Sequence, residues 1–340
     1  MTIKDVAEHS GVSVSTVSRV LNNHPDVSEA VRQRVMDAVQ SLHYVPNNSA
    51  RDLVRSRSDA IGVVVRGAEN PFFMPIIRSI EIAAENAGYE MVLHQIKAGA
   101  DELDAAALLT RSKRLNGLIL LGGCYDYTPE QTAALGVPFV CCTFTNGFGS
   151  LDASAYSSVS IDDRAEAYRA VRLLLSRGHR RIAVLLDSTR DHSISELRYQ
   201  GYCEALRDAG LPLEGALVAE TVEFEMSAAY ERMRRLLAEG VPFSAVFAIA
   251  DSMAIAAMKA LHDAGRRVPE DCSVIAIDGI EMSLYTVPTL TTLIQPAETI
   301  GERAVDILTD VLEQRSECRH LRVETTLRPG GTLGPCVRGV

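Results

Sequence analysis

Tryptophan is absent from this sequence of 340 residues, and aromatic residues together make up only 5% of it. No run of about 18 or more uncharged apolar residues occurs, so we expect no membrane-spanning helix. The N-terminal segment lacks the apolar core of a secretory signal, which favours a cytoplasmic protein. The seven cysteines form no CxxC pair and no metal-ligand spacing, so we expect reduced, mostly buried thiols.

Motifs of catalysis and cofactor binding are also missing. No GxGxxG or Walker-type phosphate loop follows an apolar run, the eight histidines include no HExxH, and no GxSxG elbow occurs. We therefore expect neither an enzyme nor a bound cofactor or metal. Carboxylates follow apolar runs at Asp187, Asp251 and Asp278. They could act as acid and base in an enzyme, or they could accept hydrogen bonds from ligand hydroxyls.

The net charge of −10 is unevenly distributed along the chain. Residues 1–58 hold 7 Lys and Arg against 6 Asp and Glu, whereas the rest of the chain holds the other 27 basic and 38 acidic residues. A small neutral-to-basic head thus precedes a large acidic body, and this division permits contact with nucleic acid through one end. A basic patch of this size could equally be solvated surface.

Residues 1–46 have the pattern of three short helices. Thr2 fits the start of a capping box that opens the first helix, and Gly11 ends it. A second helix is expected over residues 14–21, and a third after Ser28, where apolar residues recur with helical spacing. Two short helices joined by a tight glycine turn and followed by a third predict a helix-turn-helix.

The second of these helices carries the side chains that could bind DNA. Val17, Val20 and Leu21 are placed to pack inward. The outward positions are Val14, Ser15, Thr16, Ser18 and Arg19. Small apolar groups suit a thymine methyl, hydroxyls suit phosphate or base edges, and arginine can bind guanine through two hydrogen bonds. The same face could also be a polar helix surface without a partner.

From residue 60 onward, apolar runs rich in β-branched residues alternate with helical periodicity. The expected strands are residues 60–65, 90–96, 117–122, 138–142, 181–186, 245–250 and 273–278. The expected helices include residues 75–87, 164–177, 196–209, 227–238 and 252–264. Nearly continuous apolar strands separated by amphipathic helices predict parallel sheets covered on both faces, with ligands beyond the carboxyl ends of the strands.

Five short motifs give the head a specific resemblance to a known family. They are DVA at 5–7, GVS at 11–13, TVSRVLN at 16–22, VS at 27–28 and YVPN at 44–47. Together they resemble the head of the lactose-repressor (LacI/GalR-type) family of bacterial transcription regulators. The resemblance implies DNA contacts at Thr2, Val14, Ser15, Thr16, Ser18, Arg19, Asn22, Tyr44, Asn47, Ala50, Arg51, Leu53 and Arg55. Among these, Val14, Ser15 and Arg19 match residues that read bases, and Thr16, Ser18 and Asn22 match residues that mostly contact phosphate.

The segment that follows Pro46 has two interpretations. Asn47 or Asn48 can cap a short helix that runs to about Arg55, but a helix of this length is marginal by itself in water. From the residues alone, a flexible linker is the simpler expectation. The family resemblance instead implies a hinge helix that orders on operator DNA, in which Leu53 matches a wedge that enters the minor groove.

The resemblance extends through the body, on segments that include ENPFF at 69–73, RGHRRIAVL at 177–185 and RVPEDCSVIAID at 267–278. It implies a core like a periplasmic sugar-binding protein, with ligand between two subdomains. The expected effector-lining residues are Phe72, Phe73, Thr143, Asp162, His192, Ile194, Arg198, Phe224, Asp251 and Asp278. For Arg198 and Asp278 the alternative is a salt bridge that closes the cleft. For the phenylalanines it is core packing, and for Asp251 it is capping of the helix that it opens.

Two departures from the family pattern bear on the effector. Ala250 stands where many sugar-responsive members have Asn, and Thr143 stands where some have Asp. Both differences remove polar groups, so the effector could be smaller, less hydroxylated or differently oriented than a common hexose. The C-terminal residues lack apolar heptads, so we expect a homodimer on a palindromic operator.

The expected fold is α/β: an N-terminal three-helix helix-turn-helix head plus a hinge helix, then a periplasmic-binding-protein-like core of two doubly wound parallel-sheet subdomains. We expect the head at 1–46, the hinge and linker at 47–59, and the effector-binding core at 60–340. Within the core, the N-subdomain takes about 60–159 and 291–322, and the C-subdomain about 160–290 and 323–332. The expected function is a transcription regulator, most simply a repressor, controlled by a sugar or related metabolite. A solute-binding receptor without DNA function and a doubly wound enzyme are the alternatives.

Overall fold

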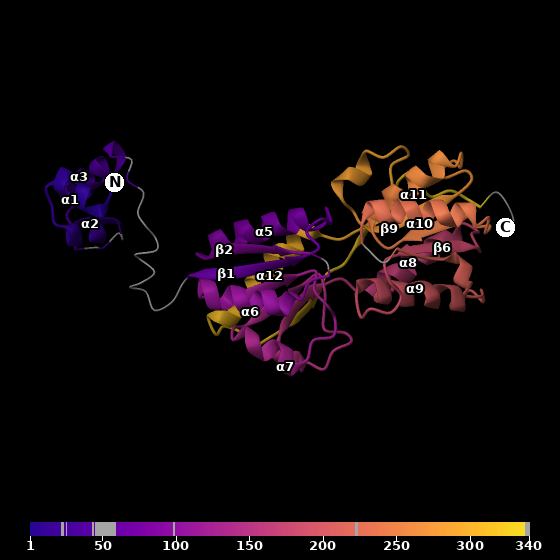
Figure 1. The fold of residues 1–340 in the computed structure, drawn as a ribbon, viewed down its shortest axis with the longest axis horizontal. Coiled ribbons are helices and arrows are strands. Elements are labelled where there is room, and N and C mark those ends of the chain that lie inside the picture. The colour runs from indigo at the N-terminus through magenta and orange to yellow at the C-terminus, as the bar shows by residue number, and fades with distance from the viewer. Residues whose placement is uncertain are drawn as a thin grey trace. The chain divides into compact units, whose positions relative to one another are not determined.

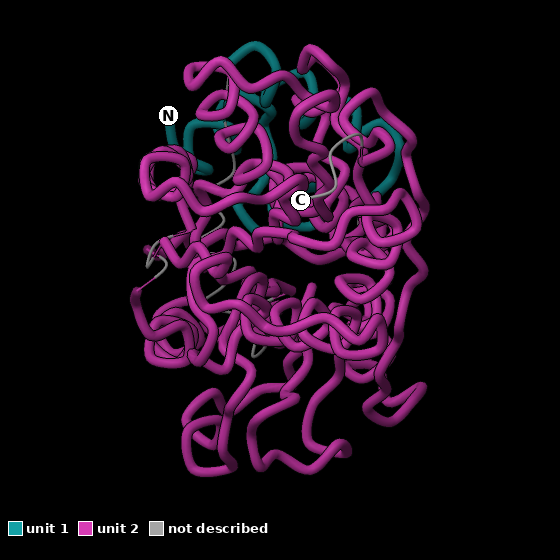
Figure 2. Tube along the Cα trace, turned by 90° about the vertical axis from the view of Figure 1, so that its right-hand side faces the viewer, with its two compact units in different colours: residues 1–58 teal, residues 59–340 magenta. Residues whose placement is uncertain are grey.

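The computed structural model describes residues 1–21, 24, 26–42, 44, 59–97, 99–221 and 224–336. The chain divides into two compact units, residues 1–58 and residues 59–340, which Figure 2 colours separately. The expected hinge at 47–59 lies outside the described residues, apart from Asp59. Within the described ranges, no helix has both the length and the apolar character needed to cross a membrane.

The described part of the first unit contains the helices α1 (Ile3–Ser10), α2 (Val14–Leu21) and α3 (Glu29–Ser41). The backbone N–H of Thr2 donates to the Asp5 carboxylate at 2.7 Å, which is the expected cap at the start of α1. Gly11 ends α1 with a φ of +67°, a left-handed conformation that suits glycine and turns the chain into α2. The helices pack on a small apolar core formed by Val6, Ala7, Val17, Val20, Val35 and Ala38.

A six-stranded parallel sheet forms the centre of the first subdomain of the second unit (Figure 1). In spatial order its strands are β11 (His320–Arg322), β5 (Ser157–Ser160), β4 (Phe139–Cys142), β3 (Gly117–Leu121), β1 (Ala60–Arg66) and β2 (Glu90–Ile96). Helices α5 (Phe73–Asn86) and α12 (Ala297–Leu312) pack on one face, and α6 (Glu102–Lys113) packs on the other. The short helix α7 (Pro129–Thr132) precedes β4.

The second subdomain repeats this plan with one antiparallel edge. Its sheet has the order β12 (Thr326–Arg328), β10 (Thr291–Ile294), β9 (Ser273–Asp278), β8 (Ala245–Ala248), β6 (Ile182–Leu186) and β7 (Val218–Glu220). Only β12 runs antiparallel to its neighbour. Beside this sheet, α8 (Asp163–Ser176) lies against α9 (Ile194–Asp208), and α10 (Met226–Ala238) lies against α11 (Asp251–Asp263).

Burial explains why the central strands read as continuous apolar runs. Every residue of β3, β4, β8 and β9 is buried, because helices cover both faces of each sheet. Strand β2 lies at the edge of its sheet, and its residues are exposed or half-buried. This strand accordingly tolerates the polar residues Glu90, His94 and Gln95 among its apolar ones.

The chain crosses between the two sheets after β5, after β10 and after β11. The expected assignment of residues 291–294 to the N-subdomain is wrong. These residues form β10, which pairs in parallel with β9 from Thr291 opposite Ile275 to Ile294 opposite Asp278. The second crossover therefore falls between Ile294 and Ala297. The residues of β10 are two threonines, a leucine and an isoleucine, a composition that suits a strand of either sheet and does not indicate which one it joins.

Candidate functional site

One face of α2 carries exposed polar and small apolar side chains. Val17 and Val20 are buried in the core of the first unit, whereas Val14 is 40% exposed and Ser15 and Arg19 are exposed. Within the part of the chain that the structure describes, the Arg19 side chain makes no hydrogen bond or ion pair. Its guanidinium is thus available for an acceptor outside the protein.

Hydroxyl groups cluster at the N-terminus of the same helix. The backbone N–H of Thr16 donates to Ser13 Oγ at 3.2 Å, so Ser13 caps α2. Ser13 Oγ also lies 2.8 Å from the hydroxyls of both Ser15 and Thr16. Unpaired backbone N–H groups and the helix dipole make such a terminus favourable for phosphate.

The remaining expected DNA contacts fall into two groups. Thr2 is exposed, Ser18 is half-buried, and Tyr44 is partly buried against the core of the first unit. Asn22, Asn47, Ala50, Arg51, Leu53 and Arg55 lie outside the described residues.

In the second unit, Arg198 is the centre of a buried group of charges. It lies on α9 and is only 1% exposed. Its Nε donates to Asp163 Oδ1 at 3.0 Å, and its Nη1 donates to the Ile249 carbonyl oxygen and lies 3.4 Å from Asp278 Oδ1. Gln295 Nε2 donates to the same Asp278 oxygen at 2.8 Å. Arg198 and Asp278 are therefore brought together by an ion pair, which was the alternative to direct ligand contact.

Burial dominates the electrostatics of this group. Burial raises the pKa of Asp278 to about 7 and that of Asp163 to about 6, even though the neighbouring Arg198 guanidinium acts in the opposite direction on both. Arg198 Nη2 is buried and lies 2.9 Å from Asp163 Oδ1, but it makes no aligned hydrogen bond with any residue that the structure describes. One strong donor at the centre of the group consequently lacks an aligned acceptor.

Asp251 has a structural role in the second subdomain. Its side chain is fully buried, and one carboxylate oxygen accepts the backbone N–H groups of Gly279 and Ile280, each at 3.0 Å, and the Ser283 hydroxyl at 2.8 Å. The other oxygen accepts the Thr292 hydroxyl. Burial raises the pKa of Asp251 to about 6. Asp251 thus fixes the loop after β9.

The expected aromatic lining residues are mainly packed in cores. Phe72 and Phe73 are 4% and 8% exposed and belong to the apolar cluster under α5 and α12. Phe73 approaches Gly122 so closely that a Cβ there would stand 2.7 Å from its Cζ. Phe224 is partly buried against the core of the second subdomain. Thr143 is 6% exposed, and its backbone N–H donates to the Val159 carbonyl oxygen at 2.8 Å.

Three further expected residues lie where the subdomains meet. Asp162 caps α8 by accepting a hydrogen bond from the Ala165 N–H. It also accepts a 2.7 Å hydrogen bond from Arg322, the last residue of β11 in the first sheet. His192 Nδ1 lies 3.2 Å from Asp126 Oδ2 of the first subdomain. Ile194 packs against an apolar cluster of that subdomain.

Four residues around this group were not expected from the sequence: Tyr125, Asp126, Asp163 and Gln295. Tyr125 is 3% exposed, and burial raises its pKa well above the usual range. Asp163 and Gln295 bind the ion-paired arginine and aspartate directly. Their place in the sequence is what could have indicated them. Each of the four lies within a few residues of a crossover or of the carboxyl end of an expected apolar strand, where ligands of such folds bind.

Comparison with known proteins accounts for both units. Residues 2–47 match the model of bacterial regulatory proteins of the lacI family, and residues 156–333 match a periplasmic binding protein-like domain. The chain is 36% identical over 329 residues to the HTH-type transcriptional regulator MalR of Clostridium butyricum, which covers 96% of this chain and 97% of that relative. The chain belongs to the LacI family of bacterial regulatory proteins.

Solved LacI-family structures match along almost the full length. A Lac repressor dimer bound to operator and the anti-inducer ONPF aligns with a TM-score of 0.82 at 26% identity, over 98% of this chain and 99% of that one. A complex of the transcriptional regulator CelR with cellobiose aligns with a TM-score of 0.71 at 30% identity, over 98% and 99%. As a LacI-family member this chain is a DNA-binding transcription regulator, and its two-sheet core has the expected fold.

Proposed function

We propose that this protein is a repressor that binds a palindromic operator as a homodimer and is controlled by a small-molecule effector held between the core subdomains. The observation that carries the effector part is the buried Arg198 group. Charged side chains seldom occupy a protein interior without a partner or a function. Here three of them gather where the carboxyl ends of parallel strands meet, which is the usual ligand position in such folds.

On the DNA side, α2 supplies the recognition surface. Val14 offers an apolar contact for a thymine methyl, and Arg19 offers two parallel N–H groups for the O6 and N7 atoms of guanine. The hydroxyls of Ser15, Thr16 and Ser18 suit phosphate or base edges. The other proposed DNA contacts rest on the family pattern alone. They are Thr2, Asn22, Tyr44 and the hinge positions Asn47, Ala50, Arg51, Leu53 and Arg55.

On the effector side, Arg198 Nη2 is a buried donor without an aligned acceptor. A ligand hydroxyl or carboxylate oxygen would satisfy it, and Asp278 and Asp163 could accept hydrogen bonds from further hydroxyls. We propose that six further residues shape the cleft around this polar centre: Phe72, Phe73, Thr143, Asp162, Ile194 and Phe224. Ala250 and Thr143 reduce its polarity, so we propose a sugar or related metabolite with fewer hydroxyls than a common hexose. The CelR structure named above contains cellobiose, which supports a carbohydrate class.

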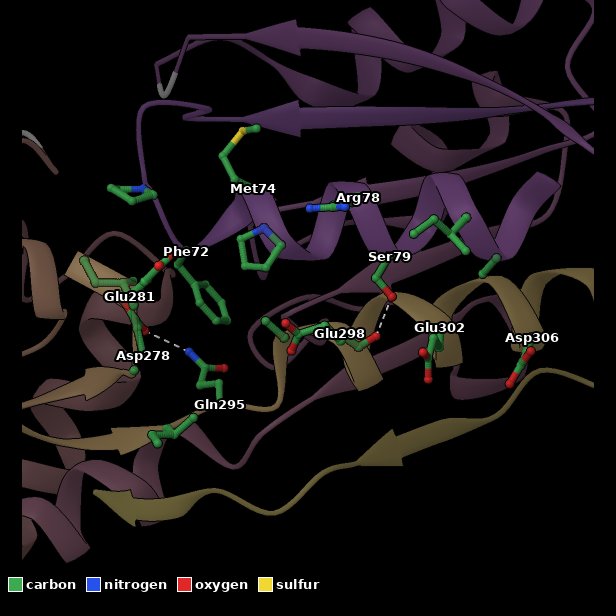
Figure 3. A pocket seen from close by; sticks show the side chains of 18 of the residues that line it. Phe72, Met74, Arg78, Ser79, Asp278, Glu281, Gln295, Glu298, Glu302 and Asp306 are labelled. Atoms are coloured by element: carbon green, nitrogen blue, oxygen red, sulfur yellow. Dashed lines mark hydrogen bonds between the residues drawn. The ribbon is translucent and has the colours of Figure 1, made fainter. Parts of the chain in front are cut away.

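A groove of 1520 Å³ on the second unit supports the homodimer (Figure 3). It runs along α5 and α12 and reaches the loop after β9. Its exposed apolar side chains are Met74, Ile82, Met282, Leu284 and Tyr285, which are 45–76% exposed. Surface of this kind usually marks a protein interface. Arg78 on α5 and Glu298 and Glu302 on α12 also line the groove, a mixture that allows self-complementary charge pairing about a two-fold axis. We propose that a second copy of this chain occupies the part of the groove along α5 and α12. Phe72, Asp278 and Gln295, which belong to the proposed effector site, line its other end.

Control by the effector requires that the ligand binds the DNA-competent and DNA-incompetent states unequally. A tenfold change in operator affinity needs a coupling free energy of about 1.4 kcal/mol, which a few hydrogen bonds can supply.

The test combines two measurements on the full-length protein. Thermal shifts against a panel of sugars and related metabolites should identify a ligand that raises the melting temperature, since binding stabilises the folded state by mass action. The same ligand should then change operator affinity in gel shifts on genomic fragments, and that affinity should weaken linearly with salt on a log–log plot. Operator binding that no stabilising ligand alters would contradict the effector proposal. A protein with no preference among DNA fragments would favour the alternative of a solute-binding receptor.

A further inference from the structure

The two subdomains of the core touch directly around His192, on the turn between β6 and α9. The backbone N–H of Tyr125, in the first subdomain, donates to the His192 carbonyl oxygen at 3.1 Å. His192 Nδ1 lies 3.2 Å from the Asp126 carboxylate, and its ring stacks on Phe148 with centroids 5.0 Å apart and planes at 19°. One residue of the second subdomain thus makes three different contacts with the first.

The first-subdomain side of this contact is held firmly. The backbone N–H of Tyr127 donates to Asn146 Oδ1 at 2.6 Å, and Asn146 Nδ2 donates to the Tyr127 carbonyl oxygen at 3.0 Å. The Tyr127 hydroxyl donates to Glu102, which is only 3% exposed. The Phe148 N–H donates to the Tyr125 carbonyl oxygen at 2.7 Å. The segment 125–127 and Phe148 are therefore fixed to each other and to α6.

The second-subdomain side is a constrained turn attached to α9. His192 has a φ of +53°, a left-handed conformation that is uncommon outside glycine and that asparagine, aspartate and histidine adopt more often than other residues. Its N–H donates to Glu196 Oε2 in the first turns of α9 at 3.0 Å. Ile194 and Leu197, also at the start of α9, pack against the apolar cluster that contains Tyr125 and Tyr127. The turn and the start of α9 are thus docked together on the first subdomain.

We propose that Asp126, Phe148 and His192 form a latch that holds the two subdomains closed, and that closure rather than ligand contact is the role of His192. The Asp126 and His192 side chains are 45% and 55% exposed, so their mutual hydrogen bond contributes little alone. The ring stack and the apolar contacts of Ile194 add to it. Any separation of the subdomains breaks all of these contacts at once. Arg198 follows on the same helix, so opening the latch also moves the proposed effector site.

Hydrogen exchange of the full-length protein, without DNA or effector, tests the latch. His192→Asn keeps a residue that tolerates the left-handed conformation but removes the ring. Asp126→Ala removes the acceptor alone. Arg190→Ala is the matched control, because Arg190 is exposed on the same turn and forms a hydrogen bond only through its backbone N–H, to Ser188, in the described structure.

In His192→Asn, we expect the peptide that contains the Tyr125 amide to exchange about tenfold faster, as local opening becomes more frequent. Asp126→Ala should cause a smaller increase in the same peptide. Arg190→Ala should leave it unchanged, and peptides from β9 should be unchanged in all three variants. Unaltered exchange at Tyr125, or equal acceleration in the Arg190 control, would overturn the latch.

The regulatory part of this inference rests on the proposed function, and gel shifts of the same variants separate the two. A regulatory latch is supported if operator affinity differs from wild type in His192→Asn and Asp126→Ala but not in Arg190→Ala. Faster exchange with unchanged operator affinity, with or without the effector, overturns its regulatory role. If the wild-type protein binds no operator, the proposed function fails while the exchange result still decides whether the latch exists.

Discussion

Gly201 in α9 lies against the backbone of Arg164 in α8, so closely that a Cβ on Gly201 would stand 2.1 Å from the Arg164 carbonyl oxygen. The same Cβ would be 2.9 Å from the Tyr168 backbone nitrogen and 3.0 Å from the Ala167 side chain. Glycine is therefore what lets the two helices pack at this separation. The contact matters for function because α9 carries Arg198.

Gly201→Ala should lower the free energy of unfolding by about 2–3 kcal/mol, because the two helices must move apart to admit the methyl group. Urea denaturation followed by circular dichroism measures this loss. Gly215→Ala is the control, since nothing lies within 4 Å of a Cβ at that position. Equal stability of the two variants would show that α8 and α9 can separate without cost at this contact.

Stability should also depend on pH through the buried carboxyls. Burial raises the pKa of Asp163 and Asp251 to about 6 and that of Asp278 to about 7, from an ordinary value of 3.8. Such groups bind protons more tightly in the folded than in the unfolded protein. Their contribution to stability is therefore fully present below the ordinary pKa and is lost as pH rises to the folded pKa.

The matched variant Asp278→Asn isolates one of these groups. Between pH of about 4 and about 7, wild-type stability should fall relative to the variant, because the folded protein holds the Asp278 proton more tightly than the unfolded chain does. Urea denaturation at several pH values measures the difference between the two proteins. A difference that does not change with pH would mean that Asp278 titrates normally.

Removal of the Asp251 carboxylate should destabilise the second subdomain. Asp251→Ala leaves the buried N–H groups of Gly279 and Ile280 and the Thr292 hydroxyl without their acceptor, so we expect a loss of about 3 kcal/mol or more. Thermal unfolding checks this, with Glu231→Ala on the exposed surface of α10 as the control. A variant that melts like the control would contradict the role assigned to Asp251.

On DNA, Arg19→Ala should weaken operator binding by about 1–3 kcal/mol and relax base preference at one position of each half-site. Effector binding should be unchanged, because Arg19 belongs to the other compact unit. Gel shifts on the operator and on single-base variants measure both effects. Arg34→Ala, at an exposed position of α3, serves as the control. Equal losses on all DNA sequences would instead indicate a phosphate contact.

The proposed dimer predicts that Met282→Glu gives a monomer. A charge placed in the apolar groove would be buried without a partner in the interface, and this strongly disfavours association. Analytical ultracentrifugation over a range of protein concentrations measures the change. Leu108→Glu is a fair comparison, because Leu108 is 70% exposed on α6 and does not line the groove. A dimer that survives in Met282→Glu would exclude this surface as the interface.

The sequence indicated the long buried strands well, because burial on both faces imposes a continuous apolar run. The run expected at 273–278 is β9 itself, and the helix expected at 196–209 begins two residues earlier in α9. Strand β5 was missed because three of its four residues are serine, and their burial comes from tertiary packing that local pattern does not reveal. The assignment of β10 to the first subdomain was wrong for a related reason. The sheet that a strand joins depends on its pairing partner, which is not revealed by the strand's own residues.

The candidate site was less predictable than the fold. The family pattern drew attention to Arg198 and Asp278, but it offered direct ligand contact and mutual pairing as alternatives. Only the three-dimensional structure brings Asp163 and Gln295 to the same pair, from positions 35 and 97 residues away from Arg198 in the chain. The contact between Asp126 and His192 likewise depends on how the two subdomains meet, which no local pattern encodes.

The three crossovers between the sheets limit how the core can be divided. Helix α12 contributes Ile300, Val305 and Leu308 to the cluster that covers the first sheet, and β11 completes the edge of that sheet. Both arise only after the whole second sheet except β12 has been synthesised. A fragment ending near residue 160 would therefore expose the apolar surface that α12 normally covers. Neither subdomain is encoded by one uninterrupted stretch of chain. Folding of the core must therefore await synthesis of nearly its entire length.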